Sequence, residues 1–148
     1  MIQTLRIPEF DDIEAAAKRI APWAVVTPLL ESPALKARIG SRVLLKAEPF
    51  QRTGSFKFRG ACNRILLIPE AERKNGVIAF SSGNHAQGVA AAAGLFDLPA
   101  TIVMPADAPR TKIENTRGYG AKVVTYDRKR EDREAIATAV LGLTNTYV

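Results

Sequence analysis

The sequence predicts an α/β protein built on an open parallel sheet with flanking helices. Between Val77 and Leu141, short apolar segments alternate with segments of helical character, giving three strand–helix pairs. Strands that alternate with helices are joined by crossovers, and crossovers make neighbouring strands parallel. The chain has 148 residues, 47% hydrophobic and 24% charged, so it can bury such a sheet in one core.

The segments before this alternation predict two helices and two extended pieces. Residues 9–20 carry apolar residues at helical spacing, with acids first and bases last, which matches the helix dipole. Pro28 makes 25–32 an irregular or edge extended segment. Residues 32–40 begin with Ser-Pro and end with Gly, as short helices do. Residues 42–48 predict a strand.

Residues 55–69 predict an amphipathic helix that ends at a proline. Its apolar stripe repeats at i, i+3, i+4, i+7 and i+8 and comprises Phe58, Ala61, Cys62, Ile65 and Leu66. Gly60 costs about 1 kcal/mol relative to alanine inside a helix, and close backbone packing would explain its presence. Because Cys62 falls on the stripe, we expect a core side chain rather than a nucleophile.

The three strand–helix pairs complete the predicted fold. Strands are expected at 76–80, 100–105 and 121–126, and helices at 84–96, 108–120 and 130–141. The sequence shows no internal repeat and no linker.

Composition argues against several classes of protein. The net charge is +6, but bases and acids are mixed, as in YDRKREDREA, so we expect a solvated surface and no nucleic-acid partner. No apolar run approaches the ~20 residues of a membrane span, and the N-terminus lacks a signal segment, which favours the cytoplasm. One cysteine and one histidine exclude an internal disulfide and disfavour a metal site.

The segment SSGNHAQG, residues 81–88, follows a predicted strand and opens a predicted helix. Open parallel sheets bind ligands at the carboxyl ends of their strands, where such turns lie. Its backbone N–H groups and the helix dipole suit a carboxylate or a phosphate. Plain capping of the helix explains a serine or an asparagine equally well, so both interpretations stay open. For His85 alone we favour a capping role over a catalytic base.

Lys57 stands between Phe56 and Phe58. Most helical lysines extend to water. A lysine desolvated between two rings would instead be held as the neutral amine, because burial disfavours the ammonium form. A neutral amine is a nucleophile and can form a Schiff base with a carbonyl. Lys57 is therefore a candidate covalent lysine, with a solvated surface lysine as the alternative.

The segments KAEPFQRTGSFKFRGACN (46–63) and SSGNHAQGVA (81–90), in this order, resemble one enzyme family. They are similar to the threonine dehydratase and serine racemase group of the fold-type II pyridoxal-phosphate enzymes, which are tryptophan synthase beta-like. The continuation MPADAPRTKIENTRGYGAKVV (104–124) fits the same group. The resemblance extends from about Pro28 to about Ala137, nearly the whole chain.

The resemblance implies pyridoxal 5'-phosphate as the cofactor and assigns its contacts. Lys57 matches the lysine that holds the cofactor as an internal aldimine and then serves as acid and base at the substrate's α carbon. Phe56 matches the aromatic residue that lies against the cofactor. Asn84 matches the asparagine that hydrogen-bonds the ring hydroxyl.

The resemblance also implies where the substrate binds. Ser82 matches the serine that faces the cofactor opposite the lysine, where it exchanges a proton. The loop that closes on the substrate carboxylate matches Ser81, Ser82, Gly83, Asn84 and His85. The implied reaction converts a β-hydroxy amino acid, L-threonine or L-serine, to a 2-oxo acid and ammonia. Serine racemase and hydroxyaspartate dehydratase are the alternatives within the family, which also implies a homo-oligomer for the full-length protein.

Family members are longer than this chain, and their phosphate-binding run of glycines has no counterpart here, because no two glycines are adjacent. We therefore expect 1–52 to be an N-terminal arm of a large domain that is mostly missing. Residues 53–141 would form the small α/β domain, and 142–148 an atypical tail. A chain so truncated predicts doubtful activity alone, and an inactive remnant that serves as a binding or assembly module is the alternative.

Overall fold

The computed structural model describes residues 6–132, 135–136 and 139–140. The helices are α1 (Phe10–Ile20), α2 (Pro33–Ile39), α3 (Lys57–Leu66), α4 (Glu70–Arg73), α5 (Asn84–Gly94) and α6 (Arg110–Gly118). The strands are β1 (Leu29–Glu31), β2 (Leu44–Lys46), β3 (Val77–Phe80), β4 (Ala100–Pro105) and β5 (Lys122–Tyr126). Two short 3-10 helices, η1 (Glu48–Phe50) and η2 (Arg52–Gly54), precede α3.

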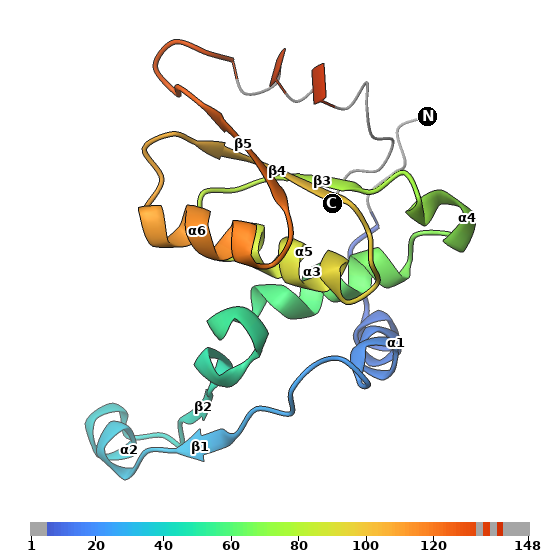
Figure 1. Ribbon diagram of the computed structural model, residues 1–148. Coiled ribbons are helices and arrows are strands. Elements are labelled where there is room, and N and C mark those ends of the chain that lie inside the picture. The colour runs from blue at the N-terminus through green and yellow to red at the C-terminus, as the bar shows by residue number, and fades with distance from the viewer. Residues whose placement is uncertain (1–5, 133–134, 137–138, 141–148) are drawn as a thin grey trace.

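The main sheet is parallel and has the order β3-β4-β5. Val77 pairs with Ala100 at the start of β3, and Thr101 pairs with Lys122 at the start of β5. Helices α3, α5 and α6 lie along one face of this sheet (Figure 1). This arrangement confirms the predicted α/β class, its parallel sheet and its flanking helices.

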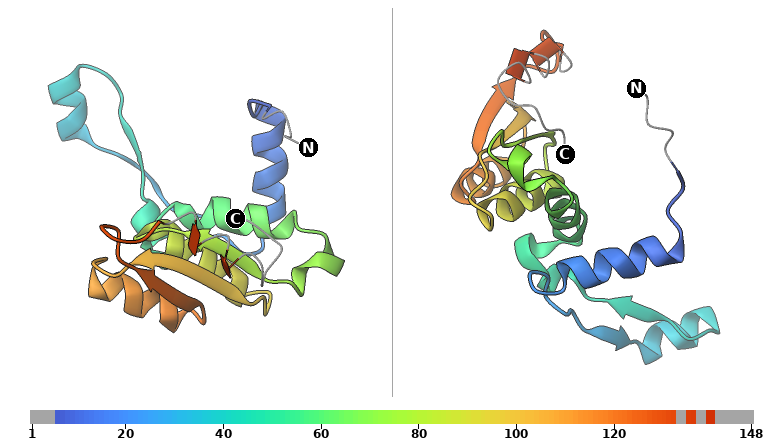
Figure 2. Two further views of the ribbon diagram at one scale, coloured as in Figure 1. Left: turned by 90° about the horizontal axis from the view of Figure 1, so that it is seen from above. Right: turned by 90° about the vertical axis from the view of Figure 1, so that its right-hand side faces the viewer.

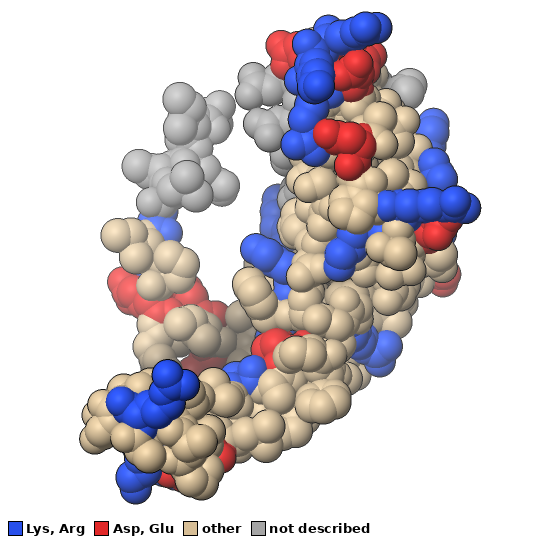
Figure 3. All heavy atoms as spheres, turned by 90° about the vertical axis from the view of Figure 1, so that its left-hand side faces the viewer, with Lys and Arg blue, Asp and Glu red and all other residues tan. Residues whose placement is uncertain are grey.

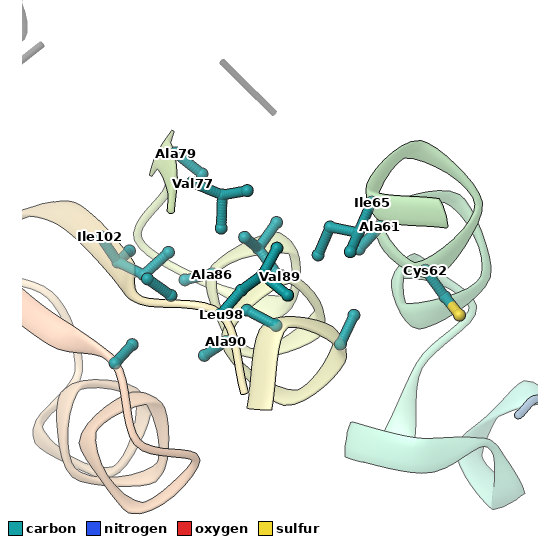
Figure 4. Close-up of a cluster of buried hydrophobic side chains, with 14 of the residues drawn as sticks. Ala61, Cys62, Ile65, Val77, Ala79, Ala86, Val89, Ala90, Leu98 and Ile102 are labelled. Atoms are coloured by element: carbon teal, nitrogen blue, oxygen red, sulfur yellow. The ribbon is translucent and has the colours of Figure 1, made fainter. Parts of the chain in front are cut away.

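The core lies between the sheet and the helices. Strands β3 and β4 are buried almost throughout. Helix α5 is rich in small residues, and its Val89 and Ala90 lie between the strands and α3 (Figure 4). Small side chains let α5 pack closely against both neighbours. Cys62 is fully buried in α3, which confirms its predicted place in the core.

The N-terminal region forms an arm that extends away from the sheet and helices (Figure 2). Strands β1 and β2 pair antiparallel, with Leu30 opposite Leu45, and every residue of both strands is exposed. The helix predicted at 32–40 is present as α2, capped by Ser32 and ended by Gly40 in the left-handed conformation. The extended pieces were predicted, but their pairing was not.

A buried glutamine joins two segments of the arm, and an aromatic contact joins the arm to the rest of the fold. The side chain of Gln51 accepts a hydrogen bond from Val25 N–H and donates one to Val25 C=O, both at 2.9 Å. The Gln51 amide therefore hydrogen-bonds the backbone of Val25 in the way that a neighbouring β-strand would. Trp23 meets Phe96 edge to face, with ring centroids 4.8 Å apart, and joins the arm to the end of α5.

Several local predictions need correction or lie outside the structure. The close packing predicted to explain Gly60 is absent, because a Cβ added there would meet no described atom within 4 Å apart from the neighbouring backbone of α3 itself. Leu66 is only half-buried, whereas the other four residues of the predicted stripe are buried. Helix α4 was not predicted. The predicted helix at 130–141 falls largely outside the described residues, and the tail 142–148 falls wholly outside them.

Candidate functional site

A polar cavity opens at the carboxyl edge of the main sheet. Its volume is about 330 Å³, and it is lined by Phe80, Ser81, Ser82, Val103, Pro105, Tyr126 and Arg128. These residues come from the ends of β3, β4 and β5 and from the loops that follow. Arg128 also pairs with Asp107 at 2.8 Å. Both predicted substrate-binding serines, Ser81 and Ser82, thus line a cavity where open α/β sheets bind their ligands.

The loop after β3 leads into α5 without an ordinary side-chain cap. Gly83 occupies the N-cap position and has no side chain to offer, and its own N–H donates to Ser81 Oγ at 3.2 Å. Asn84 and the half-buried His85 begin the helix. Helix N-termini usually rely on their N-cap side chain, so this turn is built differently from a plainly capped helix. A turn of this kind can direct backbone N–H groups at an anion.

Lys57 begins α3 at the point where α3 crosses α5. A Cβ added to Gly88 would lie 3.1 Å from the carbonyl carbon of Lys57 and 3.2 Å from the nitrogen of Phe58. Asn84 is four residues before Gly88, on the same face of α5. Because Gly88 has no side chain, α5 can approach α3 closely. The segment that carries Lys57 and the segment that carries Asn84, which were predicted to form one site, are therefore in contact.

The environment predicted for Lys57 is only half right. Phe58 points into the core and is fully buried, whereas Phe56 is 59% exposed. Lys57 is itself exposed, and its Nζ lies 5.0 Å from the centroid of the Phe56 ring. The predicted sandwich between two rings is therefore wrong, because the buried stripe of α3 starts at Phe58. One ring faces the lysine, and the other belongs to the core.

Lys112 is a residue of the site that the sequence did not reveal. It lies on α6, is half-buried, and its Nζ donates to Asn84 Oδ1 at 2.6 Å. This contact depends on how α6 packs against α5, and no spacing in the sequence reports that packing. Asn84 therefore contacts α6 through Lys112. On α5 it also lies one helical turn before Gly88, where α5 contacts α3.

An ion pair behind Lys57 links α3 to the arm. Arg59 donates to both carboxylate oxygens of Glu48, from Nε at 2.9 Å and from Nη2 at 2.8 Å. The hydrogen bond from Arg59, together with one from Thr27, holds the pKa of the Glu48 carboxyl below its ordinary value. The two side chains are 30% and 15% exposed, so the pair is partly shielded from water. It fixes the first turn of α3 against the backbone that precedes it.

The part of the chain that the structure describes holds no cluster of metal-ligating side chains. No three His, Cys, Asp or Glu residues there lie close enough to hold a metal ion. On the face shown in Figure 3, Lys and Arg lie among Asp and Glu. No helix within the described ranges combines the length and apolar character needed to cross a bilayer.

Comparison with known proteins places this geometry in a family. Residues 20–148 match the family described as pyridoxal-phosphate dependent enzyme. The chain belongs to this family. The resemblance predicted from 46–63 and 81–90 is thereby confirmed, and so is the dependence of the family on pyridoxal phosphate.

Relatives of this pyridoxal-phosphate-dependent family member carry three activities in their names. L-threo-3-hydroxyaspartate ammonia-lyase of Pseudomonas sp is 54% identical over 89% of this chain and 41% of its own length. Catabolic L-threonine dehydratase of Staphylococcus aureus is 49% identical over 83% of this chain and 36% of its own. The structure of maize serine racemase has a TM-score of 0.89 and 39% identity, covering 96% of this chain and 43% of that protein. The chain thus spans about two-fifths of the length of the relatives it matches.

The described residues fit one end of pyridoxal phosphate. Lys57 offers an accessible primary amine, which suits an aldehyde. Asn84 has its Oδ1 occupied by Lys112, so its Nδ2–H₂ group is the one left for a ring oxygen. A glycine-rich cradle for the phosphate is not among the fitting groups, since the sequence contains no adjacent glycines. The donor set therefore matches the ring and the aldehyde.

Proposed function

We propose that this chain carries the lysine-bearing half of the active site of a pyridoxal-phosphate-dependent ammonia-lyase. Its substrate would be a small β-hydroxy amino acid, L-threonine or L-serine, converted to a 2-oxo acid and ammonia. The observation that carries the proposal is the contact of Gly88 with the backbone of Lys57, one helical turn from Asn84. Family membership and the names of the relatives support it.

Three side chains would hold the cofactor. Lys57 would hold it covalently through Nζ, Phe56 would lie against its ring, and Asn84 would donate to its ring oxygen through Nδ2. Bound there, pyridoxal phosphate supplies an electron sink that stabilises negative charge at the substrate's α carbon. Since Phe56 is 59% exposed, a covering element is needed to exclude water from this lysine.

The loop before α5 would bind the substrate and move a proton. Its backbone and side chains would orient the carboxylate through Ser81, Ser82, Gly83, Asn84 and His85. Once freed, Lys57 Nζ would take the proton from the substrate's α carbon. The exposed hydroxyl of Ser82 would exchange a proton from the opposite side. Elimination of the β-hydroxyl needs only the first of these two groups at the α carbon.

We further propose that residues 1–52 are an arm that joins a larger domain, and that 53–141 form the small α/β domain. Isolated two-stranded pairs are marginal in water, and β1 and β2 are exposed along their whole length. Most of the large exposed apolar side chains also belong to residues 7–56, including Ile7, Val26 and Phe50. Such a surface fits assembly with further elements of the family fold. A cytoplasmic homo-oligomer is the state we propose for the complete protein.

Two alternative activities have specific support. The solved relative from maize is named serine racemase, and the relative from Pseudomonas acts, by its name, on L-threo-3-hydroxyaspartate. Racemisation would require Ser82 to return a proton to the face opposite Lys57. The product therefore distinguishes them: D-serine for the racemase, a 2-oxo acid for the ammonia-lyases, with the preferred substrate separating the latter.

The test supplies this chain with the remainder of the fold as a separate polypeptide, taken from the second half of maize serine racemase. Complex formation is verified by co-purification, and 2-oxo acid is then measured with L-threonine, L-serine and L-threo-3-hydroxyaspartate. We expect little product from the chain alone, product from the complex, and none from a Lys57→Ala complex. Product that persists in Lys57→Ala would contradict the proposal, as would a verified complex that yields neither 2-oxo acid nor D-serine.

A further inference from the structure

Lys112 contacts a residue proposed to bind the cofactor, although Lys112 itself has no role in the proposed function. Its Nζ lies 2.6 Å from Asn84 Oδ1. A lysine ammonium can only donate hydrogen bonds, so the atom that it meets must be the amide oxygen. The contact therefore fixes which way the Asn84 amide is turned. The oxygen faces α6, and Nδ2–H₂ is the end left for a ligand.

The backbone that carries Lys112 is itself held in place. Lys112 N–H donates to Pro109 C=O at 2.8 Å at the start of α6. One turn later the fully buried Thr116 donates from Oγ1 to Lys112 C=O at 2.7 Å. Ile113 packs against the core on the same turn. The backbone at Lys112 is thus held in place, and the residue is half-buried where its side chain extends toward Asn84.

The chemistry of the ligand group follows from this orientation. With its oxygen turned toward Lys112, the Asn84 amide presents its two N–H donors, and not its acceptor, on the opposite side. It therefore favours an oxygen without a proton over a hydroxyl that needs an acceptor. The nearby ammonium adds positive charge, which further favours an anionic oxygen.

We propose that Lys112 is a positioning residue, which orients the amide of Asn84 so that Nδ2 donates to an ionised ring oxygen of the bound cofactor. The identity of that oxygen rests on the proposed function. The orientation of the amide rests on the contact alone, so the two can be tested separately.

The first measurement uses the chain without any ligand. The side-chain ¹⁵N and ¹H resonances of Asn84 are assigned with an Asn84→Asp reference, and then compared in Lys112→Met and Lys112→Arg. We expect the Asn84 resonances to move in Lys112→Met and to stay near their original positions in Lys112→Arg, which keeps a donor. Lys74→Met is the matched control for loss of one charge. Lys74 is the C-cap residue of α4, which lies at the opposite end of the sheet and helices from α6 (Figure 1). Resonances that do not respond to Lys112→Met would overturn the inference.

The second measurement uses 4'-deoxypyridoxine 5'-phosphate, an analogue that lacks the aldehyde and so does not depend on Lys57. We expect Lys112→Met and Asn84→Ala each to weaken its binding by about tenfold, and the double variant to be no weaker than Asn84→Ala. Additive losses would overturn the positioning role even if the resonances had moved. The binding is measured on the complex with the second half of maize serine racemase, because this chain has no glycine-rich cradle for the phosphate. Undetectable binding to the wild-type complex would overturn the assigned ring oxygen together with the proposed function, while the resonance shift would still report the orientation of the amide.

Discussion

Gly88 lies against the backbone of Lys57 so closely that a Cβ at position 88 would be 3.3 Å from the Lys57 carbonyl oxygen. The neighbouring atoms are backbone, which cannot rotate away as a side chain would. The two helices that carry the site therefore approach each other at a point where only glycine fits without displacement. This contact sets the position of Lys57 relative to the loop at 81–83.

We predict that Gly88→Ala separates α3 from α5. The displacement of well-packed backbone should lower the free energy of unfolding by about 1–3 kcal/mol. Urea denaturation followed by circular dichroism measures this loss. A variant as stable as the wild type would show that α3 shifts freely, and the contact would then not be what fixes Lys57.

Gly60→Ala is the matched control, because Gly60 is also helical but the added Cβ would meet no described atom within 4 Å apart from the neighbouring backbone of its own helix. There the higher helix propensity of alanine should raise the free energy of unfolding by up to about 1 kcal/mol. Opposite signs at Gly88 and Gly60 would separate packing from propensity.

The Glu48–Arg59 pair should make the free energy of unfolding depend on pH in the acidic range. The pKa of Glu48 is lowered in the folded chain from an ordinary value of 4.5, chiefly by the hydrogen bond from Arg59. The stabilisation is therefore fully present above pH 4.5 and is lost as the pH falls through the lowered pKa. Arg59→Met should cost about 1.5–3 kcal/mol at pH 7 and flatten the decline below pH 4.5. Urea titrations at several pH values measure both effects.

An exposed pair provides the comparison for that prediction. Arg110 and Glu114 are one turn apart on α6, with side chains 90% and 52% exposed. Arg110→Met should change the free energy of unfolding by less than about 0.5 kcal/mol. An equal loss in both variants would mean that the shielding of the Glu48–Arg59 pair contributes nothing.

Cys62 should be unreactive in the folded chain. Its side chain is fully buried, and burial raises the pKa of the thiol, so little thiolate is present at neutral pH. We expect its reaction with an aromatic disulfide reagent to be at least roughly a hundredfold slower than in denaturant, because it requires opening of α3. Rapid reaction under native conditions would contradict the placement of Cys62 in the core.

The sequence predicted the sheet and its helices because their periodicities are local. Strands such as β3 are short apolar runs, and α5 is a run of small residues. Each can therefore be recognised from its own residues, without knowing what packs against it. The pairing of β1 with β2 was missed because a whole helix, α2, separates the two strands. Helix α4 was missed because four residues after Pro69 carry too little pattern.

The sequence predicted which residues belong to the site, but it did not predict how their side chains are arranged. The motifs around Lys57 and Asn84 identified the segments through family resemblance. The direction in which each phenylalanine points was not predicted. Phe56 and Phe58 both neighbour Lys57 in the sequence, but side chains two residues apart at a helix start point to different sides. The contact of Lys112 with Asn84 joins α6 to α5, and such contacts between helices leave no local signal. Gly88 was part of the motif, but its role in the approach of α3 emerged only from the packing.

Lys57 is, we propose, the lysine that this fold selects for the cofactor. The most direct measurement incubates the purified chain with pyridoxal phosphate, reduces it with borohydride and locates modified lysines by peptide mass. We expect an adduct confined to Lys57, absent from Lys57→Ala and unchanged in Lys74→Met. Adducts scattered over surface lysines, or an undiminished total in Lys57→Ala, would contradict it.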